Sequence, residues 1–159
     1  MNFRIGFGFD VHQLEKADTL ILGGIAIPSQ KGAVGHSDAD VLIHAICDAL
    51  LGAAGLRDIG NQFPNTDPTL KGIDSKILLS KTIKLLEDHN YLVGNIDATV
   101  CLEQPKINPH IENMRMVLSE ILKIESSAVS IKATTNETLG YVGREDGINA
   151  YAVALIYKP

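Results

Sequence analysis

The sequence predicts an α+β fold, a two-layer sandwich in which a mixed β-sheet is covered by helices on one face. Three observations support this prediction. Segments with strand-like alternation and segments with helical periodicity are interspersed along the chain, several predicted strands are apolar on both faces, and 159 residues suffice for about one domain. We therefore expect residues 1–159 to form a single domain with one core.

The first elements are predicted strands. Residues 3–12 alternate loosely and contain Gly6 and Gly8, a pattern typical of a strand whose backbone is closely approached by another element. Residues 19–27 form two short apolar runs about a Gly-Gly pair, which indicates a β-hairpin. The polar, glycine-bearing segment 29–35 is then expected to be a loop.

A helix is predicted from Ser37 to about Gly55. Ser37 and Asp40, three residues apart, form an acidic variant of the capping box, and apolar residues recur at helical spacing after them. At about 100° per residue, His44 lies almost opposite this apolar stripe. Asp48 follows one turn later, where it either orients the His44 ring or forms an ordinary surface pair with it.

The rest of the chain completes the predicted sandwich. Residues 58–72 are rich in turn formers and predict a long functional loop or lid. Two more amphipathic helices, three more strands and one more loop are expected: helices at 75–89 and 108–123, strands at 91–103, 130–134 and 148–157, and a glycine-containing loop at 135–145.

Apolar residues on both faces of the strands would leave the sheet face away from the helices uncovered. An exposed apolar face of this kind is normally buried against another subunit, and a closed cyclic oligomer buries it on every copy. We therefore expect a cyclic oligomer.

Composition excludes several classes of function. The net charge is −5, Lys and Arg are scattered, and Trp is absent, which argues against a nucleic-acid partner. No apolar run approaches the roughly 18 residues of a membrane span, so no membrane partner is expected. Cys47 and Cys101 stand alone in apolar surroundings, and we expect them to be reduced core residues of a soluble, cytoplasmic protein.

A candidate metal site begins in the first predicted strand. Asp10 and His12 stand two residues apart and therefore project to the same side of that strand. A carboxylate oxygen and an imidazole nitrogen suit zinc, and His44 offers a third ligand that leaves a fourth position open. The alternatives are a surface or hydrogen-bonded Asp-x-His pair and a solvated His44. The spacing indicates a zinc site with an open position.

A second group of polar residues suits phosphate. Thr134, Thr135 and Glu137 are followed by a Gly-x-x-Gly-Arg run that ends at Arg144. Hydroxyls and backbone N–H groups bind phosphate oxygens, a carboxylate binds a divalent cation, and a guanidinium makes bidentate contacts. The alternatives are ordinary turn chemistry for the threonines and a solvated arginine. Together with a metal, this group indicates a ligand that bears a diphosphate.

Six motifs follow one another along the chain: Gly-Phe-Asp-Val-His at 8–12, His-Ser-Asp-Ala-Asp-Val at 36–41, Asp-Ala-Leu-Leu-Gly-Ala-Ala-Gly-Leu-Arg-Asp-Ile-Gly at 48–60, Phe-Pro-Asn-Thr-Asp-Pro at 63–68, Pro-Lys-Ile at 105–107 and Lys-Ala-Thr-Thr-Asn-Glu at 132–137. In this order and spacing the sequence closely resembles the 2-C-methyl-D-erythritol 2,4-cyclodiphosphate synthase family over essentially its whole length. Asn65, where the family commonly has Asp, and Tyr141, where it usually has Phe, depart from the family pattern.

The resemblance implies roles for the candidate residues. The implied zinc ligands, with one zinc per subunit, are Asp10, His12 and His44. Glu137 is the implied ligand of a second divalent ion, Mg²⁺ or Mn²⁺, that binds with the substrate. His36 and Thr135 correspond to residues that stabilise the transition state. The implied substrate contacts are Ser37, Asp58, Ile59, Gly60, Phe63, Asn65, Thr66, Asp67, Pro105, Lys106, Ile107, Asn108, Thr134, Tyr141 and Arg144.

Activity and assembly are also implied by the resemblance. The family converts 4-diphosphocytidyl-2-C-methyl-D-erythritol 2-phosphate into 2-C-methyl-D-erythritol 2,4-cyclodiphosphate with release of CMP, in the non-mevalonate isoprenoid pathway. Its homotrimers have active sites at subunit interfaces and an axial cavity, near the positions of Tyr141 and Arg144, that can hold an isoprenoid phosphate. Two alternatives are a zinc-dependent nucleotide diphosphate phosphohydrolase and a non-catalytic trimeric isoprenoid-phosphate binding protein.

Overall fold

A five-stranded mixed sheet organises the computed structural model, which describes residues 2–64 and 66–159. Its strands, in spatial order, are β4 (Lys31–Val34), β1 (Phe3–Lys16), β7 (Gly147–Tyr157), β5 (Leu92–Cys101) and β6 (Val129–Thr134). β5 and β6 are parallel, whereas the other neighbouring pairs are antiparallel. The prediction of a mixed sheet is confirmed.

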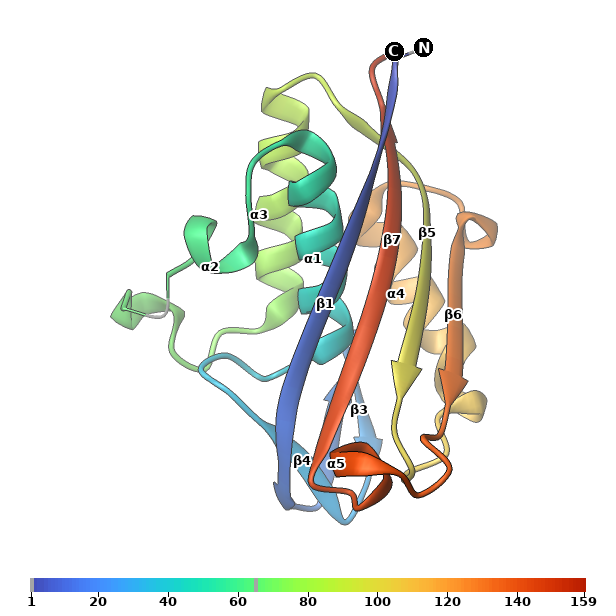
Figure 1. Ribbon diagram of the computed structural model, residues 1–159. Coiled ribbons are helices and arrows are strands. Elements are labelled where there is room, and N and C mark those ends of the chain that lie inside the picture. The colour runs from blue at the N-terminus through green and yellow to red at the C-terminus, as the bar shows by residue number, and fades with distance from the viewer. Residues whose placement is uncertain (1, 65) are drawn as a thin grey trace.

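The long helices lie on one side of this sheet (Figure 1). They are α1 (Val41–Ala54), α3 (Ser75–Asp88) and α4 (Ile111–Leu122). Leu42, Ile46 and Leu50 of α1 are fully buried and belong to the core cluster that joins helices and sheet. The helical stripe predicted for α1 is therefore the face that packs on the strands, and the two-layer α+β arrangement is confirmed.

β1 and α1 approach each other more closely than side chains would allow. A Cβ atom on Gly6 would lie 1.9 Å from the backbone oxygen of Ala49, and one on Gly8 would lie 1.9 Å from that of Ala45. The two glycines therefore let the strand backbone contact the helix directly, as their presence in the strand predicts. This contact brings His44, next to Ala45, toward the strand.

The start of α1 differs from the prediction. The helix begins at Val41, and its N-cap is Asp40 instead of Ser37. The Asp40 carboxylate is fully buried and accepts hydrogen bonds from the N–H groups of Ile43 at 3.0 Å, Gly23 at 3.0 Å and Gly24 at 2.7 Å. Three short backbone bonds outweigh the capping-box spacing that favours Ser37.

The N-terminal strands include one that local sequence does not predict. The hairpin of β2 (Thr19–Leu22) and β3 (Ile25–Pro28) is confirmed, but β4 lies in the segment expected to be a loop. β1 is longer than expected, and its end, from Gln13 to Lys16, pairs with β4. Residues 31–34 have a weak intrinsic preference for strand conformation. They form a strand because they pair with this extension of β1.

Short helical turns interrupt both predicted loops. The 58–72 segment contains α2 (Ile59–Gln62) and the 3₁₀ turn η1 (Pro68–Leu70), and the 135–145 segment contains α5 (Gly140–Gly143). Two further 3₁₀ turns, η2 (Asn108–His110) and η3 (Ser126–Ala128), flank α4. In Figure 1, α2 and η1 project away from the sheet beside α1 and α3.

The sheet face opposite the helices is apolar and exposed. Gly6 and Gly8 face α1, so the alternate residues of β1 point away from the helices. The exposed large apolar side chains on β1 and β7 are Phe3, Ile5, Phe7, Phe9, Val11, Tyr151, Val153 and Tyr157. Among the described residues, no helix combines the length and apolar character needed to cross a membrane.

Candidate metal centre

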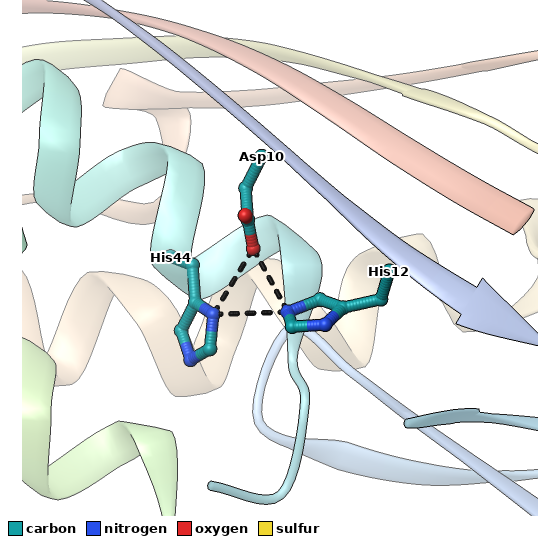
Figure 2. A group of neighbouring side chains, drawn as sticks. All are labelled: Asp10, His12 and His44. Atoms are coloured by element: carbon teal, nitrogen blue, oxygen red, sulfur yellow. Dashed lines mark hydrogen bonds and ion pairs between the residues drawn. The ribbon is translucent and has the colours of Figure 1, made fainter. Parts of the chain in front are cut away.

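Asp10, His12 and His44 converge on one point from two elements, β1 and α1 (Figure 2). Asp10 Oδ2 lies 2.9 Å from His12 Nε2 and 3.0 Å from His44 Nδ1, and the two imidazole nitrogens are 3.2 Å apart. Neighbouring ligands of a tetrahedral zinc, with bonds of about 2.0–2.1 Å, lie about 3.3 Å apart. The three atoms therefore fit one face of a zinc tetrahedron.

The outer nitrogen of each imidazole has its own hydrogen-bond partner. His12 Nδ1 lies 3.0 Å from the Val34 carbonyl oxygen, which can only accept, so His12 Nε2 is left to face the triangle. His44 Nε2 lies 3.0 Å from the hydroxyl oxygens of Ser37 and Ser75, and Nδ1 faces the triangle. Such partners orient metal-binding imidazoles.

Electrostatics hold the triangle together in the absence of a cation. Burial of Asp10 disfavours its ionised form, but the hydrogen bonds and charges of His12 and His44 outweigh burial and lower the pKa of Asp10 to about 2. Burial of His12 opposes protonation, but the hydrogen bond and negative charge of Asp10, together with the Val34 carbonyl and the charge of Asp40, outweigh burial and raise the pKa of His12 above 6.5. An anionic Asp10 thus draws a positive charge to this point.

A cavity of about 180 Å³ adjoins the three ligands. Besides the ligands, the residues that line it are His36, Ser37, Ile59, Gly60, Phe63, Leu70, Ile73 and Leu78. The Nε2 atom of His36 is buried and lacks a hydrogen-bond partner in the part of the chain that the structure describes. A buried, unpaired nitrogen is costly unless a ligand uses it, which makes His36 a candidate ligand contact.

Of the two alternatives for Asp48, a role in orienting the His44 ring is not the one that the structure shows. The Asp48 carboxylate accepts a hydrogen bond from the Ile59 N–H at 2.7 Å, and Ser37 and Ser75 orient the ring. Burial raises the pKa of Asp48. Asp48 therefore joins α1 to the start of α2 by a hydrogen bond, and α2 contributes Ile59 and Gly60 to the cavity.

Other predicted residues of the 58–67 segment lie around the same cavity or beyond it. Asp58 is exposed and caps α2 through the Asn61 N–H at 2.8 Å. Thr66 is exposed, and Asp67 caps η1 through the Thr69 N–H at 2.9 Å. Asn65 lies outside the described residues.

The phosphate-binding residues at 134–144 and the substrate contacts at 105–108 that the sequence predicts form a separate group. None of the residues lining the metal cavity comes from 105–108 or 134–144. The sheet register runs from Val11 through Asn149 and Cys101 to Thr134, which is three strand spacings, or about 14 Å. One chain therefore carries the predicted site in two parts.

The second part is organised by Glu103. Its carboxylate accepts hydrogen bonds from the backbone N–H groups of Asn136 at 2.9 Å and Thr138 at 3.4 Å. Within the loop, the Thr135 hydroxyl donates to the Glu137 carboxylate at 3.2 Å. Sequence reasoning missed Glu103, because its role depends on the side-by-side placement of the ends of β5 and β6.

The flanks of this second part are largely accessible. Lys106, Asn108 and Thr134 are exposed and Pro105 is partly so, whereas the Ile107 side chain is 1% exposed and belongs to the core. A ligand would therefore meet only the backbone at position 107.

Tyr141 and Arg144 are also exposed. The Tyr141 hydroxyl accepts a hydrogen bond from Asn149 Nδ2 at 2.7 Å, and Arg144 Nε donates to Asp146 at 3.0 Å. Both side chains are accessible at the end of the sheet that carries α5.

Comparisons with known proteins show the family to which the chain belongs. The model of the YgbB family matches residues 3–157. The 2-C-methyl-D-erythritol 2,4-cyclodiphosphate synthase of Porphyromonas gingivalis is 62% identical over 154 residues, which cover 97% of this chain and 95% of that protein.

Solved structures also resemble the chain in fold. IspF of Plasmodium falciparum, solved as a CDP complex, is 36% identical with a TM-score of 0.86, and the match covers 99% of this chain and 97% of that one. The bifunctional IspDF of Campylobacter jejuni is 34% identical with a TM-score of 0.94, and this chain spans 42% of its length. The chain therefore belongs to the YgbB family of 2-C-methyl-D-erythritol 2,4-cyclodiphosphate synthases and is a lyase.

Proposed function

We propose that this enzyme converts 4-diphosphocytidyl-2-C-methyl-D-erythritol 2-phosphate into 2-C-methyl-D-erythritol 2,4-cyclodiphosphate and CMP, with zinc bound by Asp10, His12 and His44. The observation that carries the proposal is the triangle of ligand atoms, 2.9–3.2 Å on a side, beside a cavity lined by His36. Two imidazole nitrogens and one carboxylate oxygen are a donor set of catalytic zinc sites, which keep a fourth position for water or substrate.

The proposed reaction joins two phosphates of one molecule. An oxygen of the 2-phosphate attacks the β-phosphorus, a P–O bond forms, and the bond from the β-phosphorus to the α-phosphate oxygen breaks, so that its electron pair leaves with CMP. A bound zinc supplies positive charge that reduces repulsion between the anionic groups. Because the attacking phosphate is already ionised, no nucleophilic side chain or general base is required.

His36 and the loop that carries Thr135 and Glu137 have separate proposed roles. His36 lines the metal cavity, its buried Nε2 atom has no hydrogen-bond partner among the described residues, and the side chain would hydrogen-bond a substrate phosphate as its charge changes. Thr135 would do the same from the second part of the site. Glu137, exposed beside Thr135, would bind Mg²⁺ or Mn²⁺ together with the substrate, because hard divalent ions prefer oxygen ligands.

We further propose that the single-domain chain assembles as a homotrimer with one active site at each subunit interface. Two observations support this. The sheet face opposite the helices is apolar and exposed, and the two parts of the predicted site lie about 14 Å apart across the sheet. In a closed ring, the second part of one copy completes the metal cavity of its neighbour. Tyr141 and Arg144 would then lie near the axis, where an isoprenoid phosphate would bind.

Product analysis tests the proposed reaction. Incubation of the protein with the diphosphocytidyl substrate, zinc and Mg²⁺ should give CMP and a cyclic diphosphate in phosphorus-31 NMR spectra. A linear bisphosphate would instead identify a phosphohydrolase. His12→Ala should lose both zinc and turnover, whereas His89→Ala, which changes an exposed histidine at the end of α3, should keep both. Cellular complementation by His12→Ala would favour a binding protein over an enzyme.

A further inference from the structure

A buried serine hydroxyl lies between one candidate metal ligand and a carboxylate. Ser75, the first residue of α3, is 0% exposed, and its Oγ atom lies 3.0 Å from His44 Nε2. The same hydroxyl donates a hydrogen bond to Asp38 Oδ1, and the Ser75 backbone N–H donates to Asp38 Oδ2 at 3.0 Å. The Asp38 carboxylate, the Ser75 hydroxyl and the His44 ring therefore form a continuous chain.

The carboxylate fixes the direction of every hydrogen bond in this chain. An ionised carboxylate only accepts, so the single hydroxyl proton of Ser75 points to Asp38. The Ser75 oxygen then has only lone pairs to offer His44 Nε2, so it must accept a hydrogen bond from the N–H of that nitrogen. When the ring is neutral, as a metal-binding imidazole is, a proton on Nε2 leaves a free lone pair on Nδ1, the atom that faces Asp10 and His12.

Ser37 cannot replace Ser75 in this role. Its hydroxyl also lies 3.0 Å from His44 Nε2, but it accepts the Ala39 N–H at 3.2 Å and lines the metal cavity. A hydroxyl that lines the cavity can form a hydrogen bond to a bound ligand. It can donate or accept a hydrogen bond, so it does not determine which nitrogen of His44 carries the proton. Ser75 does not line the cavity and is already committed to Asp38.

We infer that Ser75 and Asp38 are positioning residues that hold the His44 ring with Nδ1 free for a cation. This inference rests on the proposed zinc site. The backbone of Asp38 is also bonded to a residue of the cavity lining, because the Asp38 N–H donates to the Ile73 carbonyl at 3.1 Å. Ile73 lines the cavity, so the metal ligand and one cavity wall share one hydrogen-bonded support.

Zinc affinity tests this role. Partners that orient metal-binding imidazoles typically change metal affinity by about 10-fold to 100-fold when removed. In competition with a chromophoric chelator, Ser75→Ala should bind zinc at least about 10-fold more weakly than the wild type. Asp38→Asn should weaken zinc binding in the same direction. The matched control is Ser119→Ala, which removes a buried hydroxyl that, among the described residues, bonds only to the Met116 carbonyl of α4.

The outcomes separate the inference from the proposed function. Zinc binding by Ser75→Ala and Asp38→Asn within about twofold of the wild type would overturn the positioning role and leave the zinc site intact. Failure of the wild type to bind zinc would contradict the proposed function itself. Nitrogen-15 NMR of the zinc-loaded wild type needs no variant: the proton of His44 should be on Nε2 and protected from exchange, whereas a proton on Nδ1 would overturn the inference.

Discussion

The backbone of Gly8 packs against the backbone oxygen of Ala45 so closely that a Cβ atom on Gly8 would lie 1.9 Å from that oxygen. This contact joins the centre of β1 to α1, and the neighbouring residues His44 and Asp10 meet beside it at 3.0 Å. The metal site therefore depends on a helix and a strand that approach without intervening side chains.

Gly8→Ala should damage both stability and metal binding. The added methyl group meets backbone rather than a flexible side chain, so we expect a loss of about 3 kcal/mol or more in the free energy of unfolding and weaker zinc binding. The control is Gly52→Ala on α1, where the nearest atom to a Cβ is the Phe7 oxygen at 4.0 Å. It should gain up to about 1 kcal/mol. Equal urea midpoints would contradict the close contact.

Asp40→Ala should lower the free energy of unfolding by more than the loss of an ordinary helix cap does. The change removes the N-cap of α1, worth about 1 kcal/mol, and leaves the buried Gly23 N–H without an acceptor, which costs about 1–3 kcal/mol more. Asp74→Ala, which removes the exposed N-cap of α3, should cost only about 1 kcal/mol. Urea denaturation of both variants measures the difference, and equal losses would refute the buried role of Asp40.

The Asp10–His12 pair should make the metal-free protein most stable, relative to Asp10→Asn, in mildly acidic solution. The lowered pKa of Asp10 gives stability that is complete above pH 3.8 and lost as the pH falls through about 2. The raised pKa of His12 gives stability that is complete below pH 6.5 and lost as the pH rises through that raised value. The Asp10–His12 contact contributes to both shifts and is counted once; with the contribution of His44, the shift of Asp10 corresponds to about 2 kcal/mol.

Urea denaturation in the presence of a chelator, from pH 3 to pH 9, checks this window. The deficit of Asp10→Asn should be largest between about pH 4 and pH 6.5 and shrink on both sides. A deficit that does not vary with pH would mean that the pair is not an ion pair in the folded protein.

Phe7→Asp should disrupt the proposed trimer without removing zinc. Phe7 is 64% exposed on the apolar sheet face, and a charge there cannot be buried against another copy. Turnover should fall with the oligomer, because in the proposed trimer the second part of each site would come from the neighbour, but zinc affinity should persist, because one chain contains all three candidate ligands. Light scattering, zinc titration and turnover measure the three effects.

The control for this change is Met116→Asp on α4. Met116 is 56% exposed, but it lies on a helix and not on the uncovered sheet face. The Met116→Asp variant should have the same oligomeric state and turnover as the wild type. A monomeric wild type with full turnover would contradict the shared site.

The sequence predicts those features that depend on local periodicity. Spacing along one strand places Asp10 and His12 on the same side, and helical spacing places His44 opposite the buried stripe of α1. The helix start at Asp40 and the strand β4 were not predicted, because each is decided by partners distant in sequence, Gly23 and the extension of β1.

The supports of the site were harder to predict than its ligands. Ser75 appears in the sequence only as the start of a helix, and its place beside His44 depends on how α1 packs against α3. Asp48 sits one turn from His44 along the chain, yet it bonds to Ile59, because α2 folds back over that face of α1. Such contacts arise from tertiary packing, which local pattern does not encode.

The most direct test of the metal centre is a crystal of the zinc-loaded protein, soaked with CMP and measured at the zinc absorption edge. We predict one anomalous peak per chain, within about 2.0–2.2 Å of Asp10 Oδ2, His12 Nε2 and His44 Nδ1, with CMP in a pocket completed by a second copy. A zinc peak elsewhere, or none, with Asp10 Oδ2, His12 Nε2 and His44 Nδ1 still in hydrogen-bond contact with one another would contradict the proposed centre.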